Sequence, residues 1–81
     1  MEKRVGVVGI VIEDTEVVDK VNERLHEHAE IIVGRMGVPY KDKGISVISL
    51  IVDGTMDNIS SLTGQLGKIK GLKVKSAITK K

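Results

Sequence analysis

The chain contains no cysteine, phenylalanine or tryptophan, and each absence excludes a class of function. Without cysteine there are no disulfides, thiolate metal sites or thiol nucleophiles. A single tyrosine is the only aromatic residue, so the chain lacks the side chains on which an RNA-recognition sheet stacks bases. The longest apolar run, of about eight residues, is far shorter than the roughly 20 residues that span a bilayer.

The sequence has the size and the charge of one small domain. Its 81 residues are too few for two domains, so we expect a single domain over residues 1–81. Charged residues make up 30% of the chain, with both signs mixed and a net charge of +2. The first four residues lead straight into an apolar segment without the pattern of a secretory signal, so we expect a cytoplasmic protein.

Two stretches, residues 5–12 and 45–52, are rich in β-branched residues and carry large apolar side chains at both odd and even positions. A strand with one face in water alternates apolar and polar residues, and these stretches largely do not. Both faces of the sheet that they build should therefore be covered. A chain this short buries only about 60–65% of its unfolded surface, so it is too small to cover both faces alone.

Four strand-like and two helix-like segments follow one another with short connections. The expected strands are residues 4–12, 30–36, 45–52 and 72–79. The first helix begins at Asp14 or Thr15 and the second at Thr55 or Asp57, and the second ends at Gly67 or Gly71. Their apolar stripes are Val17, Val18, Val21, Leu25 and Ala29 in the first helix, and Ile59, Leu62, Leu66 and Ile69 in the second.

This β-α-β-β-α-β order predicts an α+β fold of the ferredoxin-like type, with a four-stranded antiparallel sheet. In that arrangement the first and third strands are central, and those are the two most apolar runs. The helices cover one face of the sheet. The other face then exposes one alternating set of the first strand, either Val8, Ile10 and Ile12 or Val7 and Val11.

A bare apolar sheet face of this size is rare on a monomer. We therefore expect a homo-oligomer, a dimer or a tetramer, that pairs through the sheet. Burying each valine or isoleucine contributes about 1.5–3 kcal/mol as an upper value. The alternative is that the long stems of lysine and arginine side chains cover the patch.

The segment from Gly34 to Gly44 is the most irregular of the chain. It holds the only proline, the only aromatic residue and three glycines, between two strands that should form a hairpin. Loops of this kind often carry function, so Arg35 and Tyr40 are the candidate ligand-binding residues. The alternative is structural, with Tyr40 holding the loop onto the sheet and Arg35 pairing with an acidic neighbour.

His26 and His28 are the only histidines. Two positions apart on a helix, they point about 200° apart and cannot share a metal unless the helix has frayed there. Glu27 and Glu30 are close enough in sequence to complete an open site. Histidines near a helix end also suit the negative end of the helix dipole, so we favour a surface helix end and assign no metal site. The sequence leaves the cofactor unknown.

Lysine is concentrated toward the C-terminus, and such a basic segment suggests nucleic acid as a partner. Because stacking aromatics are lacking, we expect instead that these lysines belong to a solvated edge strand. The acidic residues form no visible pair with a nucleophile or base, so we expect no enzyme and name no catalytic residue. The lysines are Lys68, Lys70, Lys73, Lys75, Lys80 and Lys81.

The run Gly-Arg-Met-Gly-Val-Pro-Tyr at residues 34–40 is fairly specific, and with it the chain resembles the small iron-only hydrogenase system regulators. The resemblance covers nearly the whole chain. That family is similar in fold to ACT regulatory domains and to the C-terminal domain of the nickel-responsive repressor, both of which associate through their sheets. The matching segments are residues 2–5, 17–25, 32–40, 43–48 and 62–67, with Gly71.

The resemblance implies an ACT-like regulatory or accessory module of a hydrogenase-related system, which senses a small ligand at a subunit interface or docks on a protein partner. The turn at residues 13–16 lacks the glycine of amino-acid-binding ACT loops, and the nickel ligands of the repressor have no counterpart. No DNA-binding segment precedes the first strand, so we do not expect a repressor that acts alone. The alternatives are a purely structural interaction module and, after it, a nucleic-acid binder that uses the C-terminal lysines.

Overall fold

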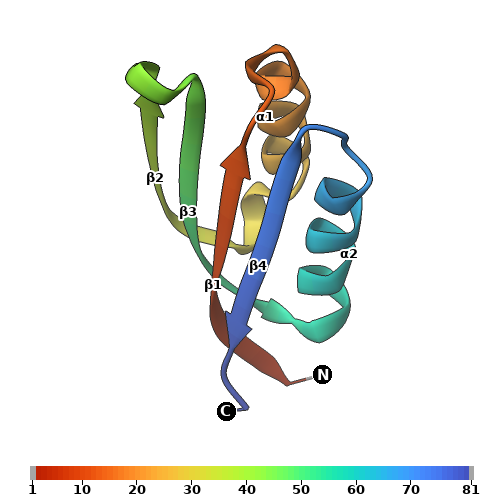
Figure 1. The fold of residues 1–81 in the computed structure, drawn as a ribbon. Helices are drawn as coiled ribbons and strands as arrows, with labels where there is room; N and C mark the ends of the chain where they lie inside the picture. The colour runs from red at the N-terminus through yellow and green to blue at the C-terminus, as the bar shows by residue number, and fades with distance from the viewer. Residues whose placement is uncertain (1, 81) are drawn as a thin grey trace.

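The computed structural model describes residues 2–80 and shows a sheet with two helices on one side (Figure 1). No helix of this part of the chain is long and apolar enough to cross a membrane. The helices are α1 (Val18–Glu27) and α2 (Met56–Gly67). The strands are β1 (Lys3–Ile12), β2 (Ile32–Tyr40), β3 (Ile45–Thr55) and β4 (Leu72–Ile78), and single 3-10 turns cover Thr15–Val17, Ala29–Ile31 and Lys41–Lys43.

The four strands form one antiparallel sheet in the order β2-β3-β1-β4. The two most apolar strands, β1 and β3, are central, as the sequence predicted. Together with the order of the helices, this confirms the ferredoxin-like β-α-β-β-α-β arrangement. The two edges of the sheet are β2 and β4, so any pairing with another chain along the sheet would use one of these strands.

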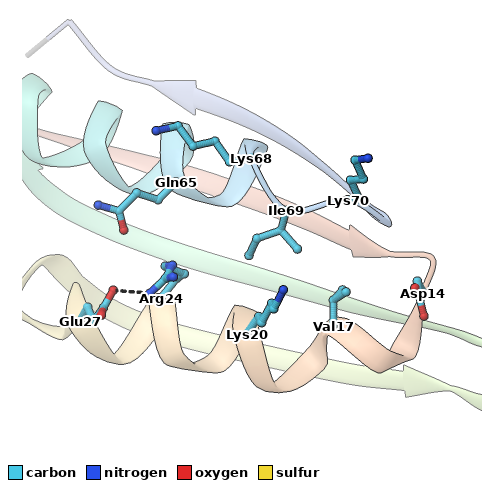
Figure 2. Close-up of a pocket in the computed structure, with 9 residues that line it drawn as sticks. All are labelled: Asp14, Val17, Lys20, Arg24, Glu27, Gln65, Lys68, Ile69 and Lys70. Atoms are coloured by element: carbon cyan, nitrogen blue, oxygen red, sulfur yellow. Dashed lines mark hydrogen bonds and ion pairs between the residues drawn. The ribbon is translucent and has the colours of Figure 1, made fainter.

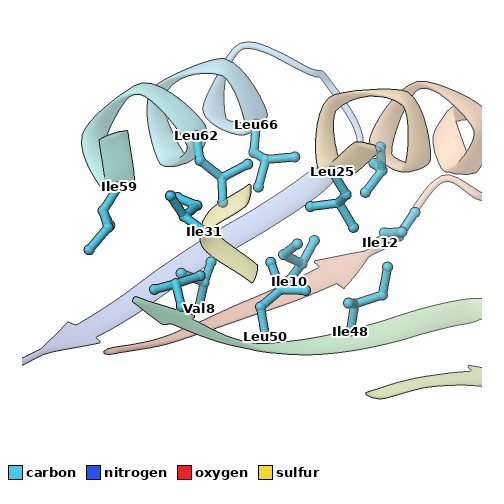
Figure 3. Packing of buried hydrophobic residues seen from close by; sticks show 12 residues of the cluster. Val8, Ile10, Ile12, Leu25, Ile31, Ile48, Leu50, Ile59, Leu62 and Leu66 are labelled. Atoms are coloured by element: carbon cyan, nitrogen blue, oxygen red, sulfur yellow. The ribbon is translucent and has the colours of Figure 1, made fainter. Parts of the chain in front are cut away.

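The hydrophobic core lies between the helices and one face of the sheet (Figure 3). The even-numbered residues Val8, Ile10 and Ile12 of β1 point toward the helices and are fully buried. The set that stays exposed is therefore the odd-numbered one, with Val7 and Val11. The other buried apolar residues are Val21, Leu25, Ile31, Ile48, Leu50, Val52, Ile59, Leu62 and Leu66.

Short polar side chains start both helical segments. Asp14 Oδ1 accepts a hydrogen bond of 3.0 Å from the backbone N–H of Glu16, at the turn that leads into α1. Thr55 Oγ1 accepts one of 3.1 Å from the N–H of Asn58 and caps α2. The structure therefore selects Asp14 and Thr55 from the expected start positions, and α2 ends at Gly67.

Strand β2 is longer than the sequence indicated. The expected strand ended at Met36 and an irregular loop continued to Gly44, whereas β2 runs through Pro39 to Tyr40 and pairs with β3 over this length. Proline is tolerated because β2 lies at the edge of the sheet. The connection to β3 shrinks to the turn Lys41–Lys43, and Gly44 follows it in the left-handed conformation with φ 67°.

One carbonyl group joins the turn after β1 to the turn before β4. The backbone N–H groups of Glu13 and Asp14 both donate to the carbonyl oxygen of Gly71, at 2.7 and 2.9 Å. Gly71 has φ 92°, a conformation that favours glycine. A Cβ at this position would lie 2.6 Å from the Cβ of Asp14, so the close approach of the two turns also excludes a larger residue.

Candidate functional site

The face of the sheet turned away from the helices, here named the open face, is strongly apolar. It carries the odd-numbered residues of β1, β3 and β4 and the even-numbered residues of β2 from Gly34 onward. Of the ten exposed large apolar side chains of the described residues, eight lie on this face. They are Val5, Val7, Val11, Met36, Val38, Tyr40, Val47 and Ile51.

The middle row of the open face is shallow, because two small residues meet there. Gly9 on β1 pairs with Ser49 on β3, and Met36 on β2 continues the same row. A Cβ at Gly9 would meet only the carbonyl oxygen of Lys75, at 3.9 Å, so packing inside the subunit does not require glycine. The side chain of Met36 is 66% exposed. This row therefore offers both a shallow depression and a projecting apolar side chain to a second molecule.

The candidate ligand-binding residues Arg35 and Tyr40 lie on opposite faces of β2. Arg35 pairs with buried Leu50 on the helix side of the sheet, and its guanidinium donates a hydrogen bond to Oδ1 of Asn22 on α1. Tyr40 pairs with Ile45 and is half exposed on the open face. The structure therefore does not bring the two side chains together within one subunit.

Arg35 lies beside two hollows along the border between α1 and β2. One has a volume of about 360 Å³ and is also lined by Asn22 and His26. The other, of about 210 Å³, reaches Val18 and Pro39. Small-molecule sites usually measure about 300–1,000 Å³, so only the first reaches that size.

The two histidines take different positions at the end of α1. His26 is exposed, whereas His28 is half buried and follows the last residue of the helix. Nδ1 of His28 lies 2.9 Å from the carbonyl oxygen of Arg24, and because a carbonyl can only accept, Nδ1 carries the proton and donates. His28 thus closes the helix end. The described residues contain no group of three histidine, aspartate or glutamate side chains placed to hold a metal.

A hollow of about 750 Å³, here named the helix groove, lies between α1 and the end of α2 (Figure 2). The sequence alone does not predict this groove. The stripe Val17, Lys20, Arg24 and Glu27 has helical spacing, but only the neighbouring helix shows that this stripe lines a groove. The other lining residues are Asp14, Gln65, Lys68, Ile69 and Lys70.

The lysines near the C-terminus do not form one basic surface. Lys68 and Lys70 line the helix groove, whereas Lys73 and Lys75 are exposed on β4 at the rim of the open face, beside Val11 and Gly9. The first pair therefore lies on the helix side of the sheet and the second pair on the other side. Lys81 lies outside the described residues.

Comparison with known proteins finds one matching family and several similar solved structures. A model of the TM1266-like family, described as iron-only hydrogenase system regulators, matches residues 4–76. The solved structure of the uncharacterized protein TM1266 from Thermotoga maritima is 38% identical. The match covers 98% of this chain and 100% of the TM1266 chain, with a TM-score of 0.92. No match was found among the curated proteins.

More distant solved structures share the fold alone. CPII from Thiomonas intermedia K12, a nitrogen regulatory PII-like protein bound to ADP, AMP and bicarbonate, is 14% identical with a TM-score of 0.53. The match covers 99% of this chain and 96% of that chain. A formyltetrahydrofolate deformylase from Pseudomonas putida KT2440 is 10% identical with a TM-score of 0.64, over 90% of this chain and 28% of that chain.

Proposed function

The chain belongs to the TM1266-like family of iron-only hydrogenase system regulators, and from that premise we propose a small regulatory module that self-associates through its open face. The module responds to a small ligand or docks on a hydrogenase-related protein partner, and no residue of it is assigned to catalysis. The observation that carries the proposal is the concentration of exposed apolar side chains on the open face.

The apolar side chains and the placement of the lysines support the open face as an interface between copies. Val7, Val11, Val47 and Ile51 are 36–43% exposed, so covering each contributes about 1 kcal/mol. Lys73 and Lys75 lie at the rim, where their ammonium groups remain hydrated when the centre is covered.

The two candidate residues take separate places in this proposal. Tyr40 lies on the open face and becomes an interface residue in the dimer or tetramer. Arg35 faces the hollow of about 360 Å³ between α1 and β2, where a small ligand has room. CPII, which shares the fold, was solved with ADP, AMP and bicarbonate, and this likeness supports a ligand-responsive module.

The experiment combines light scattering with thermal-shift screening of the full chain against amino acids, nucleotides and divalent metals. We expect an oligomer at micromolar concentration and at least one compound that raises the melting temperature. A compound bound beside Arg35 or Tyr40 should lose its effect in Arg35→Gln or in Tyr40→Phe, while the unliganded variants keep their fold. A stable single subunit refutes the assembly, and self-association without any ligand response identifies a purely structural interaction module.

A further inference from the structure

We propose that the helix groove binds a small molecule that carries an oligophosphate group, that is, two or more linked phosphates. The groove lies in the helix layer, between α1 and the end of α2, whereas the open face lies on the other side of the sheet (Figure 2). Ligand binding in the groove therefore requires neither self-association nor Arg35 and Tyr40. The inference goes beyond the proposed function and is tested independently of it.

Cationic side chains line both walls of the groove. Lys20 and Arg24 come from α1, and Lys68 and Lys70 follow α2. Figure 2 shows the side chain of Lys20 directed from α1 toward the end of α2. Within the described part of the chain, the three lysines take part in no ion pair, because both ion pairs found there belong to Arg24. Three of the four cations that line the groove therefore have no ion-pair partner among the described residues.

The acidic residues of the groove leave this charge in place. Oε1 of Glu27 lies 3.0 Å from Nη1 of Arg24, and Oε1 of Glu23 lies 3.5 Å from the same nitrogen, so Arg24 is compensated on its own helix. Asp14 lies at the end of the groove, and its Oδ1 accepts from the N–H of Glu16. The lining residues carry four positive and two negative charges, Asp14 included, so the net charge of the lining is positive and an anion with several charges would complement it.

Helix stability alone does not account for these cations. Lys68 suits the negative end of α2, where a positive charge typically contributes about 0.3–1 kcal/mol. Lys20 is placed unfavourably in this respect, because it lies in the first turn of α1, where the helix dipole favours acidic residues. A bound anion gives Lys20 a favourable partner that the subunit does not supply.

The shape of the groove restricts the class of ligand. Its volume of about 750 Å³ falls within the usual range of about 300–1,000 Å³ for small-molecule sites. Val17 and Ile69 are half buried and add an apolar part to its lining. The unpaired lysines come from two separate segments, so a ligand must present negative charges at more than one point along its length. Linked phosphates do so, and ammonium groups bind each phosphate through charge-assisted hydrogen bonds.

The test is isothermal titration calorimetry of the full chain with inorganic tripolyphosphate, ADP and citrate at low ionic strength. We expect saturable binding of tripolyphosphate or ADP, one site per chain, that weakens as salt is added. Lys20→Gln/Lys68→Gln should lower the affinity at least tenfold. Glu27→Gln should raise it severalfold, because it removes a negative charge from the groove and releases Arg24. Tighter binding of ADP than of tripolyphosphate identifies a nucleotide as the source of the phosphates.

The matched control is Lys41→Gln/Lys43→Gln, which removes the same charge from the exposed turn between β2 and β3, outside the groove. We expect it to bind as the wild type does. Absence of saturable binding, equal losses in the two double variants, or citrate binding at least as tightly as the phosphates would overturn the proposal. Light scattering of the same variants reports the assembly separately, so failure here is distinct from failure of the proposed function.

Discussion

Gly6 and Gly9 lie three positions apart in β1, and the structure gives them different roles. Gly6 is on the helix side, where an added Cβ would meet Cδ1 of Ile78 and lie 2.8 Å from the carbonyl oxygen of Ala77. Gly9 is on the open face, where an added Cβ would meet no atom closer than 3.9 Å. The first glycine therefore serves the packing of the subunit, and the second leaves space above the sheet.

We predict that Gly6→Ala lowers the free energy of unfolding by about 1–3 kcal/mol, because β4 must move away from the new methyl group. Gly9→Ala should change it by less than about 1 kcal/mol, since the loss of unfolded-state freedom offsets small packing effects. Urea denaturation of both variants, followed by circular dichroism, measures the difference. Equal losses would contradict the distinction between the two sites.

At the scale of single elements, the caps decide where the helices begin. Thr55 ends β3 and caps α2, with Oγ1 3.1 Å from the backbone nitrogen of Asn58. We predict that Thr55→Ala costs about 1 kcal/mol of stability and that Thr55→Ser, which keeps the hydroxyl, costs much less. Thermal unfolding of the two variants checks this. A Thr55→Ser loss as large as that of Thr55→Ala would show that the methyl group, and not the cap, matters.

The elements that the sequence predicted best are those with strong apolar periodicity. The buried positions of α1 and α2 and the strands β1 and β3 follow directly from the spacing of valine, leucine and isoleucine. The expected stripes run too far, because Ala29 is exposed in the turn after α1 and Ile69 lies beyond the end of α2. Strand β2 was predicted too short, since Gly37 and Pro39 are usual signals of a loop and only the edge position makes them compatible with a strand. The β3 strand likewise continues to Thr55, past residue 52, where the expected strand ended.

The same error explains what the sequence missed about the candidate site. In a strand, residues an odd number of positions apart point to opposite faces, so Arg35 and Tyr40 separate once β2 is known to include both. As long as residues 37–44 were expected to form a loop, the sequence set no relative direction for these two side chains. The helix groove was missed for another reason, because its walls come from Lys20 and Lys68, whose proximity depends on how the two helices pack.

At the scale of the whole molecule, one subunit has a complete core on one side of the sheet and an apolar surface on the other. We predict that Ile51→Lys, in the middle of the open face, raises the dissociation constant of the oligomer at least about 100-fold, or roughly 2.8 kcal/mol. The physical reason is that an unpaired ammonium group would have to be desolvated in the interface. Light scattering over a range of concentrations measures the change.

The matched control for that variant is Met56→Lys, which places the same charge on an exposed apolar residue in the first turn of α2, away from the open face. It should keep the oligomer. Dissociation of both variants alike would mean that the added charge destabilises the oligomer wherever it is placed. Loss of the oligomer in Met56→Lys alone would indicate that the interface lies in the helix layer.

The carbonyl of Gly71 has a mechanical consequence for the fold. Because two amide groups share this one oxygen, the turn that starts the first helix and the turn that ends the second cannot separate without breaking both bonds together. The two turns therefore hold the ends of the two helices together, next to β1 and β4, the first and last strands of the chain. Both bonds are backbone bonds, and they depend on Gly71, because a side chain at this position would collide with Asp14.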